Sequence, residues 1–251
     1  MTQTAHTAAT RDTRRIMAMI ADKLQQVHER IARACMQAGR DVQSVTLLSV
    51  SKTFGADAVR DAVAAGEQRF GENYVQEGLD KIAALADLRP RIEWHLIGPL
   101  QSNKTRAVAE AFDWVQSVDR LKIAQRLSEQ RPAHLPPLQL CLQVNISGEA
   151  SKSGLRAVDV AELAHAVAAL PRVRLRGLMA IPELAASLTA QRTPHRALRE
   201  LMQSLQADGL ALDTLSIGMS ADLEAAVLEG ATMVRIGSAI FGDRPPVTPA
   251  P

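Results

Sequence analysis

The chain has 251 residues, of which 47% are hydrophobic and 22% are charged, the balance of a globular protein with one large domain or two small ones. Lys and Arg total 29 against 27 for Asp and Glu, and a net charge of +2 gives too weak a field to recruit nucleic acid or anionic lipid. We therefore expect a small-molecule ligand, with no nucleic-acid partner and no membrane partner.

The two cysteines, Cys35 and Cys141, form no CxxC pair and have no metal-ligand spacing, so neither a disulfide framework nor a metal site is expected. The opening "MTQTAHTAATRDTRR" is polar and lacks the apolar core of a signal peptide. No uncharged apolar run reaches the length of a membrane span. These features predict a cytoplasmic protein.

Residues 1–12 are expected to form a flexible tail, and an amphipathic helix is expected to follow them. Gly39 is the expected stop of that helix. The apolar residues of the helix recur at helical spacing: Ile16, Ile20, Leu24, Val27, Ile31 and Cys35.

Short β-type runs then alternate with Ala- and Leu-rich helical stretches. The eight expected strands are residues 45–50, 68–73, 92–98, 113–118, 138–147, 173–181, 215–220 and 232–238. The expected helices between them are residues 56–65, 74–87, 103–111, 119–130, 157–169, 194–207 and 221–229.

Strict alternation of strands and helices predicts parallel strands joined by right-handed crossovers, and eight such units in this length indicate a single (β/α)8 TIM barrel with an additional N-terminal helix. An open doubly wound sheet is the alternative, but no GxGxxG fingerprint follows the first strand. We expect residues 13–244 to form one barrel domain, and residues 245–251 ("PVTPAP" with its preceding Pro) to form a flexible C-terminal tail.

Lys52 falls at the C-terminal end of the first expected strand, on the face where barrel enzymes build their sites. An isolated lysine at a strand end marks only the exit of the strand into water. In a barrel, a partly desolvated and neutral lysine amine at this position can attack an aldehyde to form a Schiff base. The aldehyde could belong to a sugar or to a cofactor.

Two Gly/Ser turns near the C-terminus predict a phosphate site. In "LSIGMSAD" a strand leads into a turn with Ser220 as the expected helix N-cap, so that backbone N–H groups converge near Met219 and Ser220. Gly237 and Ser238 repeat the pattern after the eighth strand, and barrels commonly bind phosphate after strands seven and eight. Each turn taken alone is better explained by an ordinary capped helix, and Asp222 and Glu224 in the first turn partly oppose an anion there.

Arg235 lies inside the last strand, and strand alternation places it on the same side as Gly237. A buried arginine requires a partner. A pyridoxal 5'-phosphate ring nitrogen is one partner that fits a Schiff-base lysine and a phosphate site, and an ion pair with a nearby carboxylate is the alternative.

Several blocks in fixed order resemble the pyridoxal-phosphate homeostasis proteins, a family related to the N-terminal barrel domain of alanine racemase. The blocks are "VSKT", "FGENYVQE", "WHLIGPLQSNKT", "VNISGEASKSG", "RGLMAIP", "SIGMSAD" and "VRIGSAIFGDR", which together run from about residue 45 to residue 244.

The resemblance implies a (β/α)8 barrel in which Lys52 carries pyridoxal 5'-phosphate as an internal aldimine. It also implies that the phosphate lies against the turns at Ser216 to Ser220 and at Gly237 to Ser238, that Arg235 faces the pyridine nitrogen, and that Asn73 lines the site. The implied function is to hold the cofactor and to buffer or deliver it, with apo-enzymes that need pyridoxal phosphate as partners and a monomeric chain. Where many relatives have "SKTKP", this chain has "SKTFG", so that Phe54 replaces a second lysine. Lys152 in "ASKSG" is retained and is a candidate for a role in transfer.

A racemase-like enzyme and a Schiff-base sugar aldolase are the competing functions. A racemase needs two bases on opposite faces of the substrate, and the sole tyrosine is Tyr74. We expect no further domain after Arg244 to close the site, which favours a carrier over an enzyme. His95 is expected to be a strand-end histidine whose ring is satisfied by backbone groups.

Overall fold

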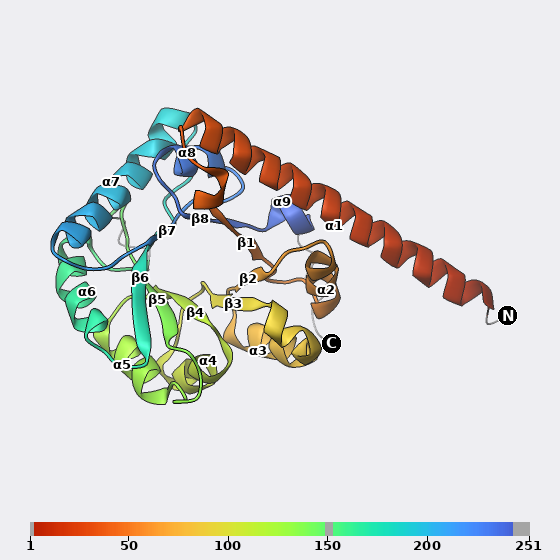
Figure 1. The fold of residues 1–251 in the computed structure, drawn as a ribbon, viewed down its shortest axis with the longest axis horizontal. Helices are drawn as coiled ribbons and strands as arrows, with labels where there is room; N and C mark the ends of the chain where they lie inside the picture. Colours follow the sequence, from red (N-terminus) through yellow and green to blue (C-terminus); the bar gives the residue numbers. More distant parts are fainter. Residues whose placement is uncertain (1–2, 149–152, 243–251) are drawn as a thin grey trace.

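The computed structural model describes residues 3–148 and 153–242, and the strands in this part of the chain form a closed parallel barrel with the sequential order β1 to β8 (Figure 1). The barrel closes through pairing of β1 with β8, in a register that aligns Leu48 with Arg235. The strands are β1 (Thr46–Val50), β2 (Arg69–Glu72), β3 (Glu93–Leu96), β4 (Trp114–Val118), β5 (Leu138–Gln143), β6 (Val173–Met179), β7 (Thr214–Ser216) and β8 (Met233–Ile236). All eight predicted strands are confirmed.

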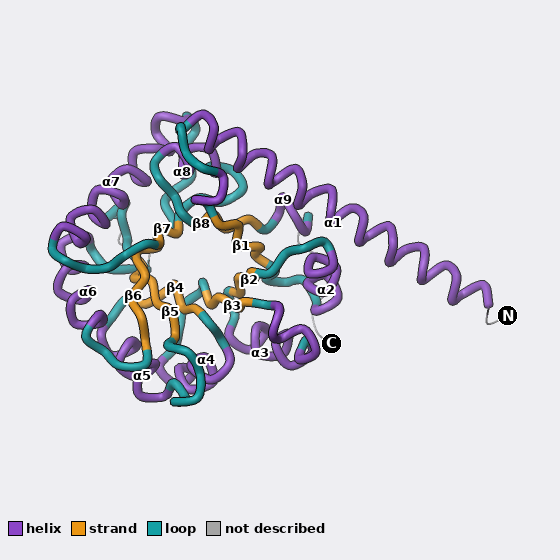
Figure 2. Tube along the Cα trace, in the orientation of Figure 1, coloured by secondary structure: helices purple, strands orange, loops and turns teal. Residues whose placement is uncertain are grey.

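Helices surround the barrel on its outside, as the purple and orange tubes of Figure 2 show. They are α2 (Ala56–Ala64), α3 (Val75–Ala84), α4 (Thr105–Ala111), α5 (Leu121–Gln130), α6 (Val160–Ala168), α7 (Leu188–Ala207), α8 (Leu223–Leu228) and α9 (Ser238–Phe241). Short 3-10 helices are Val42–Ser44, Ala86–Arg91, Ser102–Lys104 and Ala157–Asp159. The predicted (β/α)8 fold is therefore confirmed.

The N-terminal helix α1 (Gln3–Gln37) begins about ten residues earlier than the sequence predicted, and its first part extends away from the barrel (Figure 1). The segment expected to be a tail contains neither Gly nor Pro, so nothing in it terminates a helix that residues further along have nucleated. The helix ends as predicted. Gly39 has φ +64°, and the N–H groups of Gly39 and Arg40 donate to the carbonyls of Met36 and Cys35 at 3.2 and 2.9 Å, which is a Schellman motif. The tail expected at residues 245–251 lies outside the described residues.

The outward faces of the strands pack beneath the helices in one large apolar core. Trp94 and Phe70 are among the largest fully buried side chains of this core, and their rings lie 5.8 Å apart. The last five turns of α1 join it through a buried stripe of residues: Ile20, Leu24, Val27, Ile31 and Cys35. This core fixes the strand ends on which a site can be built.

The barrel interior has a mixed character. One small apolar cluster contains Leu48, Val50, Ile97 and Met233, and a second contains Trp114, Cys141 and Met179. The polar side chains that are buried within the barrel strands include His95, Gln116, Ser216 and Arg235. TIM-barrel interiors are usually filled by branched aliphatic residues, so these four polar residues need a specific explanation.

Within residues 3–148 and 153–242, no helix is both long and apolar enough to cross a membrane. The same part of the chain contains no group of three or more His, Cys, Asp and Glu side chains placed to hold a metal ion.

Candidate ligand-binding site

A cavity of about 450 Å³ opens at the C-terminal mouth of the barrel. Seven of the eight predicted site residues line it: Lys52, Asn73, Met219, Ser220, Arg235, Gly237 and Ser238. The eighth residue, Ser216, is not among the lining residues. The sequence did not predict the apolar part of the wall, which consists of Val50, Phe54, Ile97, Ile181 and Ala221.

The loop that carries Lys52 is held by a buried ionic cluster. Lys81 from α3 donates through Nζ to the carbonyl of Ser51, to Glu72 and to Glu77, each at 2.7 Å. On the other side of Lys52, the N–H of Thr53 donates to Glu77 at 2.5 Å, and Thr53 has φ +70°. The backbone is therefore tied to the cluster at the residues immediately before and after Lys52.

Glu72 is the fully buried member of this cluster. Its Oε1 also accepts a hydrogen bond from the hydroxyl of Ser51 at 2.5 Å. Burial raises the pKa of the Glu72 carboxyl, and the charge of Lys81 and the hydrogen bonds from Lys81 and Ser51 act in the opposite direction. Lys81 was not predicted from the sequence, although a Glu four residues before a Lys on a helix was a local signal for the Glu77 pair.

Asn73 reaches the cavity because of a glycine in the neighbouring loop. A Cβ at position 98 would lie 2.0 Å from the carbonyl oxygen of Asn73, so only Gly98 permits this approach of the two loops. Asn73 lines the cavity, and its Oδ1 is buried without a hydrogen-bond partner among the described residues. A buried amide oxygen without a partner marks a position where a ligand group can bind.

The loop between β7 and α8 differs in detail from the prediction. Ser220 is not the N-cap of the helix, because α8 begins at Leu223 and Asp222 occupies the cap position. The Asp222 carboxylate accepts from the N–H of Met219 at 2.6 Å and pairs with His195 at 3.0 Å, so the N–H of Met219 is already used. Burial raises the pKa of Asp222, but the hydrogen bonds from His195 and Met219 outweigh it and leave the pKa lowered.

The two Gly/Ser turns nevertheless meet at the cavity. The hydroxyls of Ser220 and Ser238 lie 3.4 Å apart and come from the loops after β7 and β8. At Gly237 a Cβ would lie 3.1 Å from the carbonyl oxygen of Val50, so a side chain there would crowd strand β1. This end of the cavity therefore presents two neighbouring hydroxyls beside a glycine.

Arg235 is buried in β8 and also lines the cavity. Its Nη1 donates to the carbonyl and the hydroxyl of Ser216 at 2.7 and 2.9 Å, and its Nη2 donates to the carbonyl of Ala180 at 2.8 Å. Burial lowers the pKa of Arg235 to about 10, and the charge of Asp222 partly offsets this effect. The ion pair with a carboxylate, which was the alternative for Arg235, is not present among the described residues.

Two aromatic residues bear on the competing functions. The Phe54 ring lies 5.2 Å from that of Phe241, so Phe54 joins the Lys52 loop to α9. Tyr74 is 61% exposed and does not line the cavity. Lys152 lies outside the described residues.

The class of protein is defined by its fold and its site. The fold is a closed (β/α)8 barrel, with Lys52 after the first strand and Arg235 in the last strand. Residues 23–245 match the family described as alanine racemase, N-terminal domain. The alanine racemase of Corynebacterium glutamicum shares the fold, with a TM-score of 0.67, 18% identity, and coverage of 94% of this chain and 63% of that one.

Closer relatives define the family. The pyridoxal phosphate homeostasis protein of Pseudomonas aeruginosa is 61% identical over 93% of this chain and 100% of its own length, and that of Escherichia coli K12 is 53% identical over 90% and 97%. PipY of Synechococcus elongatus, in a structure with pyridoxal phosphate bound, has a TM-score of 0.77, with 37% identity over 89% of this chain and 100% of PipY. This chain belongs to the pyridoxal phosphate homeostasis protein family.

Proposed function

We propose that the protein binds pyridoxal 5'-phosphate in the cavity as a Schiff base on Lys52, holds it reversibly, and buffers it or delivers it to apo-enzymes. The observation that carries the proposal is the convergence of Lys52, Arg235 and the Ser220/Ser238 hydroxyl pair on one cavity. The names of the relatives and the cofactor in the PipY structure support it.

The residues of the cavity fit the chemical groups of the cofactor. Three of the five N–H donors of Arg235 are used by Ser216 and Ala180, and the other two have no partner among the described residues. These two N–H donors suit the pyridine nitrogen of the cofactor, which accepts a hydrogen bond when it is unprotonated. The Ser220 and Ser238 hydroxyls suit phosphate oxygens, and the Asn73 amide suits a polar ring substituent. The volume lies within the usual range for small-ligand sites.

The chemistry that the cofactor supplies is that of an aldehyde, which condenses with a primary amine to an imine with loss of one water. Lys52 supplies that amine at the cavity wall. Hydrolysis or exchange with another amine reverses the bond, and this reversibility is what a buffering or delivering protein requires.

The same residues favour a carrier over a racemase. A guanidinium keeps its proton and donates to the ring nitrogen, so that nitrogen stays unprotonated and the ring withdraws electrons weakly. Racemisation also needs a second base, and Tyr74 is exposed and away from the cavity wall. We therefore propose a non-catalytic function.

We propose further that a single chain carries out this function in the cytoplasm. Residues of one chain line the cavity, so a monomer is sufficient for this function. The two cysteines are buried and unpaired, as suits a reducing compartment.

The experiment is a transfer assay combined with isotope exchange. The loaded protein is expected to restore activity to an apo-enzyme that requires pyridoxal phosphate. With L- and D-amino acids in deuterated water, it is expected to exchange the α-hydrogen no faster than the free cofactor does. Failure to transfer would contradict delivery. Rapid exchange that disappears in Tyr74→Phe would replace the carrier with a racemase-like enzyme.

A further inference from the structure

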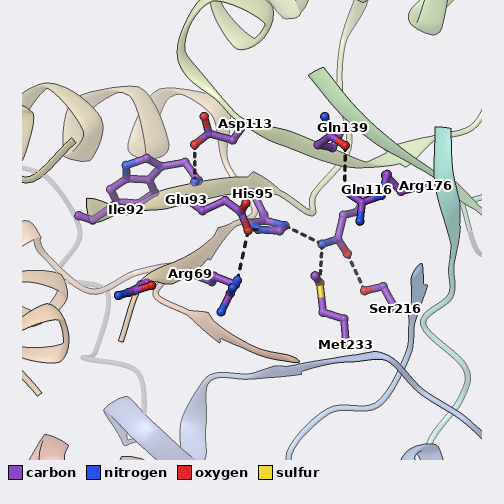
Figure 3. Close-up of polar contacts among 12 residues, drawn as sticks. Arg69, Ile92, Glu93, His95, Asp113, Gln116, Gln139, Arg176, Ser216 and Met233 are labelled. Carbon is purple, nitrogen blue, oxygen red and sulfur yellow. Dashed lines mark hydrogen bonds and ion pairs between the residues drawn. The ribbon is translucent and has the colours of Figure 1, made fainter. Parts of the chain in front are cut away.

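A continuous chain of side-chain hydrogen bonds crosses the barrel interior and ends at Arg235. Nη1 of Arg235 lies 2.9 Å from Oγ of Ser216, which lies 2.6 Å from Oε1 of Gln116. Nε2 of Gln116 lies 2.9 Å from Nδ1 of His95, and Nε2 of His95 lies 2.9 Å from Oε1 of Glu93. Figure 3 shows the part of this chain from Glu93 to Ser216.

The residues at the two ends of this hydrogen-bond chain, Arg235 and Glu93, determine which group donates in each hydrogen bond. Arg235 can only donate, so the Ser216 oxygen accepts from it, and the Ser216 hydroxyl donates its own proton to Oε1 of Gln116. The Gln116 amide therefore presents its oxygen to Ser216 and its N–H to Nδ1 of His95. Since Nδ1 then carries a lone pair, the ring proton is on Nε2 and faces the carboxylate of Glu93, which can only accept.

The residues around this chain of hydrogen bonds keep its protons in these positions. His95, Gln116 and Ser216 are fully buried, and burial lowers the pKa of His95, which keeps its ring neutral. The His95 ring stacks on Trp114 at 5.0 Å between centroids and 12° between planes. The Gln116 amide also donates to the sulfur of Met233 at 3.1 Å, which is consistent with its nitrogen facing away from Ser216.

At the cavity, this chain of hydrogen bonds ends on the guanidinium of Arg235. Gln116 is the hydrogen-bond acceptor of Ser216 and thereby turns a Ser216 lone pair toward Nη1. A planar guanidinium cannot tilt one donor without tilting the others. The direction of the two remaining N–H donors therefore depends on residues that do not line the cavity.

We propose that Gln116, His95 and Glu93 are positioning residues that act through Ser216 to aim Arg235 at the ring nitrogen of bound pyridoxal phosphate. This inference rests on the proposed function, because that function places the ring nitrogen opposite Arg235. The chain accounts for the polar residues inside a barrel that would otherwise be filled with aliphatic side chains.

The first test compares pyridoxal phosphate with its carbocyclic analogue, in which C–H replaces the ring nitrogen. Gln116→Met keeps the length of the side chain and removes its hydrogen bonds to Ser216, His95 and Met233. We expect about a 3- to 10-fold weaker affinity for pyridoxal phosphate, the range for loss of one hydrogen bond, and an unchanged affinity for the analogue. The control is Gln139→Met in the adjacent strand β5, because Gln139 contacts Arg176 and Pro137 rather than the chain.

The outcomes separate the two proposals. Equal losses for both ligands would mean that Gln116 only supports the fold, and would overturn the positioning role. A wild-type protein that binds neither ligand would overturn the proposed function itself. A change in Gln139→Met equal to that in Gln116→Met would also overturn the positioning role.

The second test needs no ligand and reads the protons directly. In ¹⁵N NMR spectra of the wild type at neutral pH, His95 is expected to be neutral with its proton on Nε2. In the double variant Glu93→Gln/Gln116→Glu the acceptor-only residue is next to Nδ1, so the His95 proton is expected to move to Nδ1. The hydrogen bonds that link Ser216, residue 116, His95 and residue 93 are retained, and only the contact with the Met233 sulfur is lost. The double variant is then expected to prefer pyridoxal phosphate over the analogue as the wild type does. A wild-type His95 with its proton on Nδ1 would contradict the proposed hydrogen-bond directions and overturn the proposal. This result is decisive even if Gln116→Met does not fold.

Discussion

Nζ of Lys81 lies 2.7 Å from the carbonyl oxygen of Ser51, the residue immediately before Lys52. A buried ammonium from helix α3 thereby fixes the backbone at which the first strand leaves the barrel. The same ammonium neutralises Glu72, whose side chain has no exposure to solvent. The position of the proposed cofactor-binding lysine thus depends on a second lysine that does not line the cavity.

Lys81→Met is expected to destabilise the protein by about 3–5 kcal/mol, because it leaves Glu72 as a buried charge without its partner. Without Lys81 the pKa of Glu72 rises further above its value in the unfolded chain, so the folded state binds a proton more tightly. The stability of the variant should therefore fall as pH rises above the unfolded value near 4.3. Urea unfolding across this range measures the effect, with the exposed Lys122→Met as the control. If Lys81→Met lowered the free energy of unfolding by no more than Lys122→Met does, the stabilising role of the cluster of Lys81, Glu72 and Glu77 would be contradicted.

The fold was predictable because its signal is periodic and local. The alternation of apolar runs such as "VTLLSV" with helical segments such as residues 56–65 repeats eight times, and each repeat reports the same architecture. Strand ends then identify the residues at one mouth of the barrel, which is why Lys52, Arg235 and Ser238 could be found from their positions.

What could not be predicted depends on contacts between residues far apart in the sequence. His95 was expected to be satisfied by backbone groups, but its partners are the side chains of Glu93 and Gln116, the latter from another strand. Ser220 has the side chain of an N-cap, yet the carboxylate of Asp222 competes for the same turn and is fixed there by His195 of α7. A single sequence does not show such partners.

Gly98→Ala is expected to displace Asn73, because the new Cβ would lie 2.0 Å from the Asn73 carbonyl and a backbone atom cannot rotate away. We expect a fall in stability of about 1–3 kcal/mol and at least a tenfold loss of pyridoxal phosphate affinity. Gly55→Ala is the control, since no atom lies within 4 Å of a Cβ there. Thermal unfolding and absorbance titration measure the two effects. Unchanged binding in Gly98→Ala would show that Asn73 does not contribute to the site.

Ser220→Glu is expected to weaken pyridoxal phosphate far more than unphosphorylated pyridoxal. The carboxylate would add a negative charge beside Ser238, where the proposal places the phosphate dianion. We expect a loss of at least tenfold for the phosphorylated ligand, measured by absorbance titration, and the exposed Ser204→Glu as a control without effect. Equal losses for the two ligands would place the phosphate elsewhere in the cavity.

Glu93→Gln tests the electrostatics at the other end of the interior chain. Burial raises the pKa of Glu93, but the hydrogen bond from the neutral His95 ring and the charge of Arg69 contribute to lowering it to about 2. A carboxyl with a lowered pKa stabilises the fold above its unfolded value near 4.3, and this stabilisation is lost as pH falls toward 2.

Because the Glu93 side chain is 40% exposed, solvent screening reduces the effect, and we expect the variant to be less stable by about 1 kcal/mol at pH 7. The difference from the wild type should be smaller at pH 3. Urea unfolding at the two pH values measures it, and a difference that grows at pH 3 would contradict the assignment.

The central claim is that Lys52 forms the bond to pyridoxal phosphate, and mass mapping after borohydride reduction tests it most directly. The protein is loaded with pyridoxal phosphate, reduced and digested, and the modified peptide is identified. The account predicts one main adduct, on Lys52, and neither this adduct nor the Schiff-base absorbance in a folded Lys52→Ala variant. An adduct found chiefly on Lys104 or Lys152, or an undiminished adduct in Lys52→Ala, would contradict it.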